Sequence, residues 1–323
     1  MCKVMGMHAT TNAFSGRGDA ALSPSYRQCV CDLDYCIPLS RGMITPLKTN
    51  ASMKSIRRNI LNDVFNTTSR PISTFTSMSY TIVDTEEQIR QLITDIEACL
   101  IQPSFLYVDL EGINLCRRGT IAIMQILIAP DPNVRLVDVH TLQAKAFETL
   151  AASGTTLKDI LQSHHYPKAF YDVRNDSDAL YNLYGVKLNC VVDIQVLEFA
   201  TRTKPSRFVS GLGKSIERDA GLSWAASAKC QKIKEAGLRL FAPEKGGSYE
   251  VFSQRPMLPE IEEYCAHDVV LLPRLLLKYA DRLSLRKTKA AGINQEAIRR
   301  VNCALDPHFN GKGQHMAIGP QIG

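Results

Sequence analysis

Three apolar segments rich in β-branched residues follow one another between residues 105 and 139, and they constrain the fold more than any other feature of the sequence. They cover 105–113, 120–128 and 134–139. Residues common in turns separate them, including Gly119 and the APDPN stretch at 129–133, which is typical of a hairpin loop. The spacing predicts a three-stranded antiparallel meander.

Helix-like and strand-like segments alternate after this meander, which predicts further strands in the same sheet. The expected elements are helices over 144–152 and 156–161, a strand over 168–173, a helix over 177–184 and a strand over 190–196. The chain reads as helical from residue 197, and Pro273 should interrupt the last long helix. The pattern predicts an α/β fold, a mixed sheet flanked by helices.

The folded part is expected to start at residue 79. A strand-like SYTIVDT stretch comes first, and Thr85 with Gln88 forms a capping box that opens an amphipathic helix. Residues 1–78 are rich in Ser, Thr, Asn and Met without apolar period, which predicts a largely disordered or loosely ordered arm. The sequence thus predicts a folded domain over 79–285 and a basic, flexible tail over 286–323.

The charge is unevenly distributed along the chain. Residues 1–79 carry nine basic and four acidic side chains, and residues 286–323 carry six and two. The body between them has 23 basic and 26 acidic groups, a net charge of −3. That balance argues against a basic surface for nonspecific binding of duplex DNA. The tails are either solvated or add counterion-release affinity for nucleic acid, and both readings stay open.

Composition and targeting signals favour a soluble cytoplasmic or nuclear protein with no membrane partner. The chain has 323 residues, no apolar run long enough to span a bilayer, and no apolar core of a secretory signal near Met1. Its ten cysteines are scattered, which predicts free thiols in a reducing compartment. The cluster Cys29, Cys31 and Cys36 lacks the second ligand pair of a zinc site.

Acidic side chains inside apolar segments are the clearest functional signal, because a buried carboxylate is costly unless a cation or donor compensates it. Asp109 and Glu111 end the first meander strand, and their spacing of two places them on one face. Gly112 follows and allows a backbone or ligand to come close. Oxygen ligands in this pattern suit a divalent metal.

Two other places supply acidic groups. The loop after the strand over 168–173 contains Asp172, Asp176 and Asp178, where an N-cap role for Asp176 would be sufficient locally. On the last long helix, Tyr264 and Asp268 are four residues apart and share a face. Taken alone, that pair is more simply explained as a half-buried tyrosine beside an exposed aspartate.

In this order, the three motifs resemble the DEDD superfamily of 3′-5′ exonucleases, in particular its tyrosine subclass typified by ribonuclease D. The resemblance covers about residues 79–283 and implies a ribonuclease H-like fold. The family pattern maps onto Asp109, Glu111, Tyr264 and Asp268. For the second motif it favours Asp176 over Asp178, with Asp172 third. The histidine subclass would need a histidine at Glu263.

The resemblance implies a metal-dependent 3′-5′ exonuclease that hydrolyses single-stranded RNA or DNA from the 3′ end. Asp109, Glu111, Asp176 and Asp268 would hold two Mg²⁺ or Mn²⁺ ions about 4 Å apart. One ion activates a water and the other stabilises the leaving oxygen, while Tyr264 orients the water. The alternative is a catalytically weak or inactive member of this fold that acts as a nucleic-acid-binding or scaffold protein.

Several other residues are weaker candidates. Basic side chains near the motifs could contact phosphates: Arg117, Arg118, Arg174 and Lys214. The GLGKS stretch at 211–215 lacks the first glycine and preceding strand of a phosphate-binding loop, so it is expected to start a helix. His164 and His165 lie in a loop-like stretch and are expected to be solvated or to cap.

Overall fold

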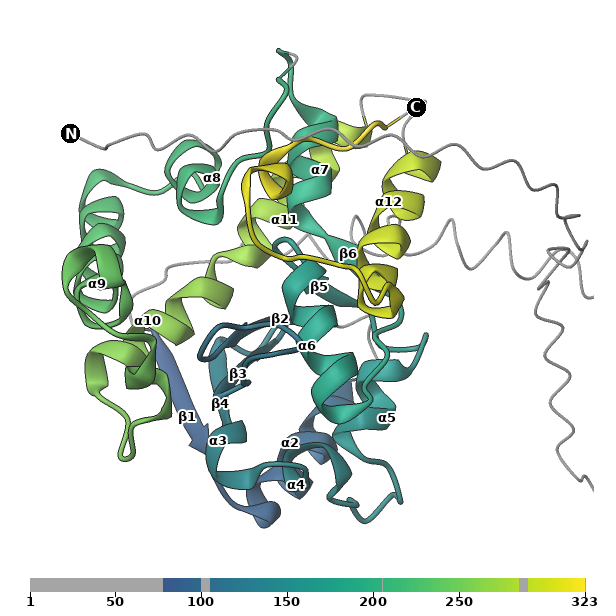
Figure 1. Ribbon diagram of the computed structural model, residues 1–323, viewed down its shortest axis with the longest axis vertical. Coiled ribbons are helices and arrows are strands. Elements are labelled where there is room, and N and C mark those ends of the chain that lie inside the picture. Colours follow the sequence, from purple (N-terminus) through teal and green to yellow (C-terminus); the bar gives the residue numbers. More distant parts are fainter. Residues whose placement is uncertain (1–77, 100–104, 205, 285–289, 323) are drawn as a thin grey trace, which may run out of the picture. The chain divides into compact units, whose positions relative to one another are not determined.

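The computed structural model describes residues 78–99, 105–204, 206–284 and 290–322, and they form a mixed sheet with helices on both faces (Figure 1). The strands are β1 (Ser79–Val83), β2 (Leu106–Glu111), β3 (Ile123–Ile128), β4 (Asn133–Asp138), β5 (Lys168–Phe170) and β6 (Val191–Asp193). Their order is β1-β4-β3-β2-β5-β6. β3 is antiparallel to both β2 and β4, and the other pairs are parallel. The predicted meander and mixed sheet are confirmed.

The helices connect and cover these strands. They are α2 (Glu86–Ala98), α3 (Val139–Leu142), α4 (Lys145–Glu148), α5 (Leu157–Gln162), α6 (Arg174–Tyr184), α7 (Ile194–Thr201), α8 (Leu212–Asp219), α9 (Trp224–Phe241), α10 (Pro259–Val270), α11 (Leu272–Ser284) and α12 (Ala290–Asn302). Short 3₁₀ turns are η2 (Pro243–Lys245), η3 (Tyr249–Ser253), η4 (Cys303–Leu305) and η5 (Gln314–Ala317). The predicted capping box of Thr85 and Gln88 opens α2. No helix within these described residues is long and apolar enough to cross a bilayer.

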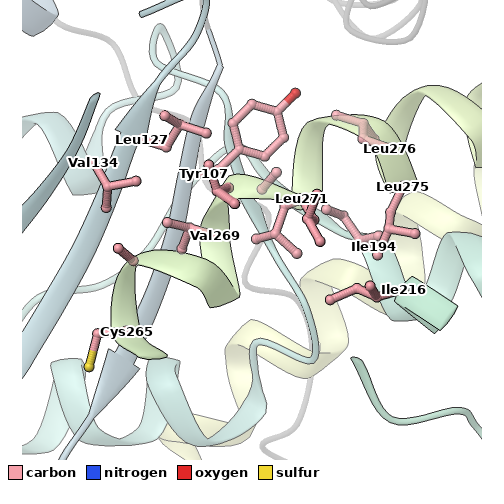
Figure 2. Packing of buried hydrophobic residues seen from close by; sticks show 14 of the residues in the cluster. Tyr107, Leu127, Val134, Ile194, Ile216, Cys265, Val269, Leu271, Leu275 and Leu276 are labelled. Atoms are coloured by element: carbon pink, nitrogen blue, oxygen red, sulfur yellow. The ribbon is translucent and has the colours of Figure 1, made fainter. Parts of the chain in front are cut away.

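Side chains of β2 alternate between two apolar cores, one on each face of the sheet. Val108 packs in the core with α2, α5 and α6, whereas Tyr107 packs in the core with α7, α10 and α11. Figure 2 shows this second core, in which Tyr107 and Leu127 of the sheet lie near Val269 of α10. Because the alternation has a period of two, Asp109 and Glu111 share the face of Tyr107, toward α10.

One predicted boundary is confirmed and one predicted helix is wrong. α10 ends at Val270 and α11 begins at Leu272, which confirms the interruption expected at Pro273. Of the helix expected over 144–152 only the short α4 forms, and another short helix, α3, precedes it. Between them Gln143 has φ 51°, a left-handed conformation that ends the first turn.

The segment that carries the second acidic motif turns earlier than predicted. β5 stops at Phe170 rather than at residue 173, because Asp172 has φ 67° and the chain bends there. The carboxylate of Asp193 accepts the amides of Asp172 and Val173, both at 3.2 Å. Asp193 also caps α7, so β6 ends at Asp193 and not at residue 196. Consequently α6 starts at Arg174, three residues before the predicted start.

The flexible tail predicted over 286–323 differs from the structure over residues 290–322. Helix α12 packs against α6, α7 and β6. Arg300 is 1% exposed and donates to Asp193 at 2.9 Å and to Gln195 at 2.8 Å. Part of the positive charge read as solvated is therefore buried among carboxylates. Residues 286–289, and the predicted N-terminal arm except Met78, lie outside the described residues.

Replacing Arg300 by Met should lower the free energy of unfolding by about 3 kcal/mol, since it leaves the carboxylate of Asp193 buried without its cation and removes one of the two arginines that pair with Glu296. Arg299 is the matched control. It contacts the same Glu296 at 2.7 Å, but its side chain is 61% exposed, so Arg299→Met should cost less than about 1 kcal/mol. Urea unfolding measures both. Equal losses of free energy of unfolding in the two variants would contradict the stabilising role of Arg300.

Candidate active site

The first acidic pair stands at the end of β2, where the chain turns sharply. Asp109 and Glu111 point toward α10, and Gly112 follows directly. A Cβ atom on Gly112 would lie 2.1 Å from the carbonyl oxygen of Thr120. Glycine is therefore required here so that the returning chain can pack against the strand end. The close approach expected at Gly112 is made by backbone.

Helix α10 supplies the third motif. Its first residue is Pro259, which suits a helix start, and its face carries Tyr264 and Asp268. α9 packs closely against it, because a Cβ on Gly237 would lie 2.6 Å from the ring of Tyr264. The ring of Phe241 lies 4.9 Å from that of Tyr264, centroid to centroid. These contacts fix the tyrosine ring at the edge of the site.

Carboxylate oxygens of Asp109, Glu111 and Asp268 lie within 4.8 Å of one another. The hydroxyl of Tyr264 is within hydrogen-bonding reach of the carboxylates of Glu111 and Asp268. Residues that are more than 150 positions apart in the sequence are thus brought together, as the motif pattern predicts. Three oxygens at this separation could coordinate a single divalent cation.

Asp176 completes the cluster from α6. It lines the same cleft of about 340 Å³ as Asp109, Glu111 and Asp268. The residue is 5% exposed, and within the described part of the chain its Oδ1 atom has no hydrogen-bond partner. It sits in the first turn of α6 but does not cap the helix, whose N-cap is Val173. A buried, unsatisfied carboxylate oxygen is rare in folded proteins.

The two alternatives for the second motif are occupied elsewhere. Asp178 is buried and forms an ion pair with Arg117 at 2.7 Å, and it also accepts the Arg117 amide. Asp172 reaches the cleft, but its carboxylate is held by Arg174 at 2.5 Å. Asp176 therefore has the carboxylate available for a ligand.

Burial raises the pKa values of all four carboxyls. Desolvation raises those of Asp109 and Glu111 well above the usual range, and the charges of Asp176 and Asp268 raise them further. The pKa of Asp176 rises to about 8 and that of Asp268 to about 6, chiefly through burial. Among the described residues, no lysine or arginine forms a salt bridge with these four. The missing positive charge is what a divalent cation would provide.

Without metal, stability should fall as pH rises, because the pKa of Asp176 is about 8 in the folded protein and about 3.9 in the unfolded chain. Above about pH 3.9 the carboxyl of Asp176 ionises in the unfolded chain but keeps its proton in the folded protein. The folded state therefore loses stability relative to the unfolded chain as pH rises toward 8. Asp176→Asn should therefore stabilise the protein in EDTA by on the order of 2 kcal/mol above about pH 8, and little near pH 4. Urea unfolding across this range measures the gain; a gain independent of pH would contradict the assignment.

Some of the weaker candidates have structural roles. Arg117 also donates to the carbonyl oxygen of Asp306 at 2.8 Å, and Arg174 donates to that of Met316 at 2.8 Å. Both guanidiniums are thus engaged, whereas Arg118 and Lys214 are exposed. His164 and His165 are exposed, with ring centroids 3.9 Å apart. Cys29, Cys31 and Cys36 lie outside the described residues.

The GLGKS stretch does start a helix, α8, as predicted. Its Ser215 is buried and lies 2.6 Å from the hydroxyl of Tyr171, which also donates to the Ser210 carbonyl. Sequence reasoning missed the support that Asp193 and Arg300 give to the loop before α6. The position of Asp193 between a strand and a helix was the available signal, since that is where helix caps occur.

Solved structures with the same fold include Trypanosoma brucei RNase D in a complex with GMP. It has a TM-score of 0.58 and 22% identity and covers 75% of this chain and 69% of that one. The catalytic core of Trypanosoma brucei Rrp6 has a TM-score of 0.54 and 17% identity, over 77% and 59% of the two chains. At these identities the similarity shows the fold, which is ribonuclease H-like.

Sequence comparison identifies the family. The mouse protein described as piRNA biogenesis protein EXD1 is 33% identical over 129 residues, which is 39% of this chain and 21% of that protein. The human protein is 29% identical over 175 residues, 53% and 29% of the two chains. The matches thus span less than a third of these relatives. The family model described as 3′-5′ exonuclease matches residues 80–283. With its three acidic motifs and a ribonuclease D-like fold, the chain belongs to the DEDD 3′-5′ exonuclease family.

Proposed function

We propose that this protein is a metal-dependent exonuclease that shortens single-stranded nucleic acid from the 3′ end. The convergence of Asp109, Glu111, Asp176 and Asp268 in one cleft carries the proposal. These groups lie on β2, α6 and α10, so a purely structural role would have to explain one buried and three half-buried carboxylates with no cationic partner among the described residues. One solved RNase D structure from Trypanosoma brucei is a complex with RNA U12, which supports a nucleic-acid substrate.

The residues present fit divalent cations. All four are hard oxygen ligands, and the unsatisfied Oδ1 of Asp176 faces no competing donor among the described residues. The ions that these carboxylates would hold, Mg²⁺ or Mn²⁺, supply a nucleophilic water at neutral pH and stabilise the charge on the leaving 3′ oxygen.

Tyr264 positions the attacking water in this proposal. Burial raises its pKa well above the usual value, and the charges of Asp268, Glu111 and Asp109 raise it further. The phenol therefore keeps its proton at neutral pH and acts as a hydrogen-bonding group rather than as a base. Its anchor between Glu111 and Asp268 fixes the direction of the hydroxyl, which is how a positioning group lowers the cost of orienting a nucleophile.

The test uses single-stranded RNA and DNA of the same sequence, labelled at the 5′ end, with Mg²⁺, Mn²⁺ or EDTA. We expect a metal-dependent ladder of products that shorten from the 3′ end, with nucleoside monophosphates released. The comparison of the two substrates ranks RNA against DNA. If the protein binds the strands but cleaves neither of them with Mg²⁺ or Mn²⁺, the proposed enzyme is wrong and the protein is a nucleic-acid-binding scaffold.

A further inference from the structure

A second, larger cavity opens beside the catalytic cleft. It has a volume of about 990 Å³ and is lined by residues of α8, α9 and α10, of which α9 and α10 lie side by side (Figure 1). Gly211, Leu212, Tyr264 and Asp268 line both this cavity and the catalytic cleft. A chain whose end lies at the carboxylates could therefore continue into this cavity, here named the α8–α9 groove.

The α8–α9 groove carries basic side chains that are not committed elsewhere. Lys214, Lys234 and Lys245 line it, and none of them has a side-chain hydrogen bond or ion pair with another residue that the structure describes. The two arginines that line the groove, Arg202 and Arg218, differ from these lysines, because both form ion pairs with the buried carboxylate of Glu198. Glu217 and Glu235 also line the groove, so its attraction for phosphate depends on where each lysine lies.

Lys234 lies nearest the catalytic cleft. Its Nζ atom packs against Gly213, where a Cβ would lie only 2.0 Å away. Its charge acts on both Asp268 and His267. His267 lines the groove and is 8% exposed, and its Nε2 atom has no hydrogen-bond partner among the described residues. A buried nitrogen without a partner beside a lysine marks a place where a polar ligand would be received.

Trp224 lies one turn before Ser227, which is the first residue of α9 to line the groove. It is the only tryptophan of the chain and is 87% exposed. On α9 it shares a helical face with Ser227, Gln231 and Lys234, all three of which line the groove. Ten residues of helix separate Trp224 from Lys234, a distance of about 15 Å. That length corresponds to about four stacked nucleotides.

We propose that the α8–α9 groove binds the single strand that leads to the catalytic cleft, with Lys234 on a phosphate near the reacting end and Trp224 stacked on a base about four nucleotides away. This inference rests on the proposed function. Single-stranded nucleic acid is the occupant that the groove favours, because lysines and an exposed indole on one helical face suit alternating phosphates and bases. Stacking on a base would also explain why the indole of Trp224 is exposed to solvent.

Trp224 itself reports on the strand. The test uses the full wild-type chain with Ca²⁺ in place of Mg²⁺ or Mn²⁺, so that the four carboxylates are kept while hydrolysis of the strand is not supported. Unlabelled single-stranded oligonucleotides of about 12 nucleotides should quench the tryptophan fluorescence, whereas a dinucleotide should bind without quenching. If a 12-nucleotide strand binds without changing the fluorescence, it does not pass Trp224. That result would contradict the proposed binding of the strand in the groove, but not the proposed exonuclease activity. If no strand binds at all, the proposed function fails with it.

Two further variants separate specific contacts from general charge. Lys234→Ala should weaken binding of the 12-nucleotide strand by about tenfold, measured by anisotropy of a 5′ label. Lys232→Ala is the control, because it removes the same charge from α9 on a side that does not line the groove. Trp224→Ala should cost about tenfold for the long strand and nothing for the dinucleotide. Equal losses for both lysines, or a Trp224→Ala variant that changes only the oligomeric state in sedimentation, would overturn the proposal.

Discussion

The substitution Asp109→Asn is expected to reduce exonuclease activity by about a thousandfold or more while the protein stays folded. Asp109 lies in the middle of the cluster, where it interacts with Asp176, Asp268 and Glu111. Losing its charge removes a shared ligand, but it also relieves repulsion, so the free energy of unfolding in EDTA should rise. Activity on a labelled strand and urea unfolding of the same preparation measure the two effects.

Asp84→Asn is the matched control for that experiment. Asp84 is an exposed aspartate directly after β1, so the same chemical change should leave both activity and stability within error. Activity of Asp109→Asn within about tenfold of the wild type would mean that the carboxylate cluster does not perform the reaction.

The pair Asp176→Asn and Asp178→Asn should give opposite results. Asp176→Asn removes a ligand and should lower activity by at least about a hundredfold, without loss of stability. Asp178→Asn breaks a buried ion pair with Arg117 and should cost about 3 kcal/mol of stability, while the folded fraction keeps its activity. The measurements are initial rates per folded molecule at low temperature and urea unfolding in EDTA.

This pair distinguishes the second motif directly. If Asp178→Asn abolished activity in folded protein and Asp176→Asn did not, the assignment of Asp176 would be wrong. Loss of activity in both variants, with no loss of stability in Asp178→Asn, would also contradict the account. In that case the ion pair between Asp178 and Arg117 would not have the structural role assigned to it.

The sheet and the site could be predicted because their signals are local. β-branched segments and turn residues define β2, β3 and β4, and a spacing of two or four residues sets which side chains share a face. Asp109 with Glu111 and Tyr264 with Asp268 are such pairs. The choice of Asp176 needed a resemblance, because three aspartates stand within seven residues and local spacing does not separate them.

The C-terminal segment could not be predicted because its order depends on distant partners. Residues 290–322 look basic and weakly periodic, yet Arg300 is buried by Asp193 and Gln195, more than 100 residues away in the chain. The early end of β5 has the same origin, since Asp193 fixes the turn at Asp172. Long-range ion pairs of this kind leave no periodic pattern in the sequence.

The central claim is that the four clustered carboxylates form a site for divalent cations. Calorimetric titration of Mn²⁺ into metal-free protein near neutral pH, in two buffers of different ionisation enthalpy, tests it most directly. The raised pKa of Asp176, about 8, predicts that metal binding releases protons, and that Asp109→Asn loses most of the binding. Absence of Mn²⁺ binding to the wild type would contradict the claim. So would Asp109→Asn binding Mn²⁺ as tightly as the wild type, without release of protons.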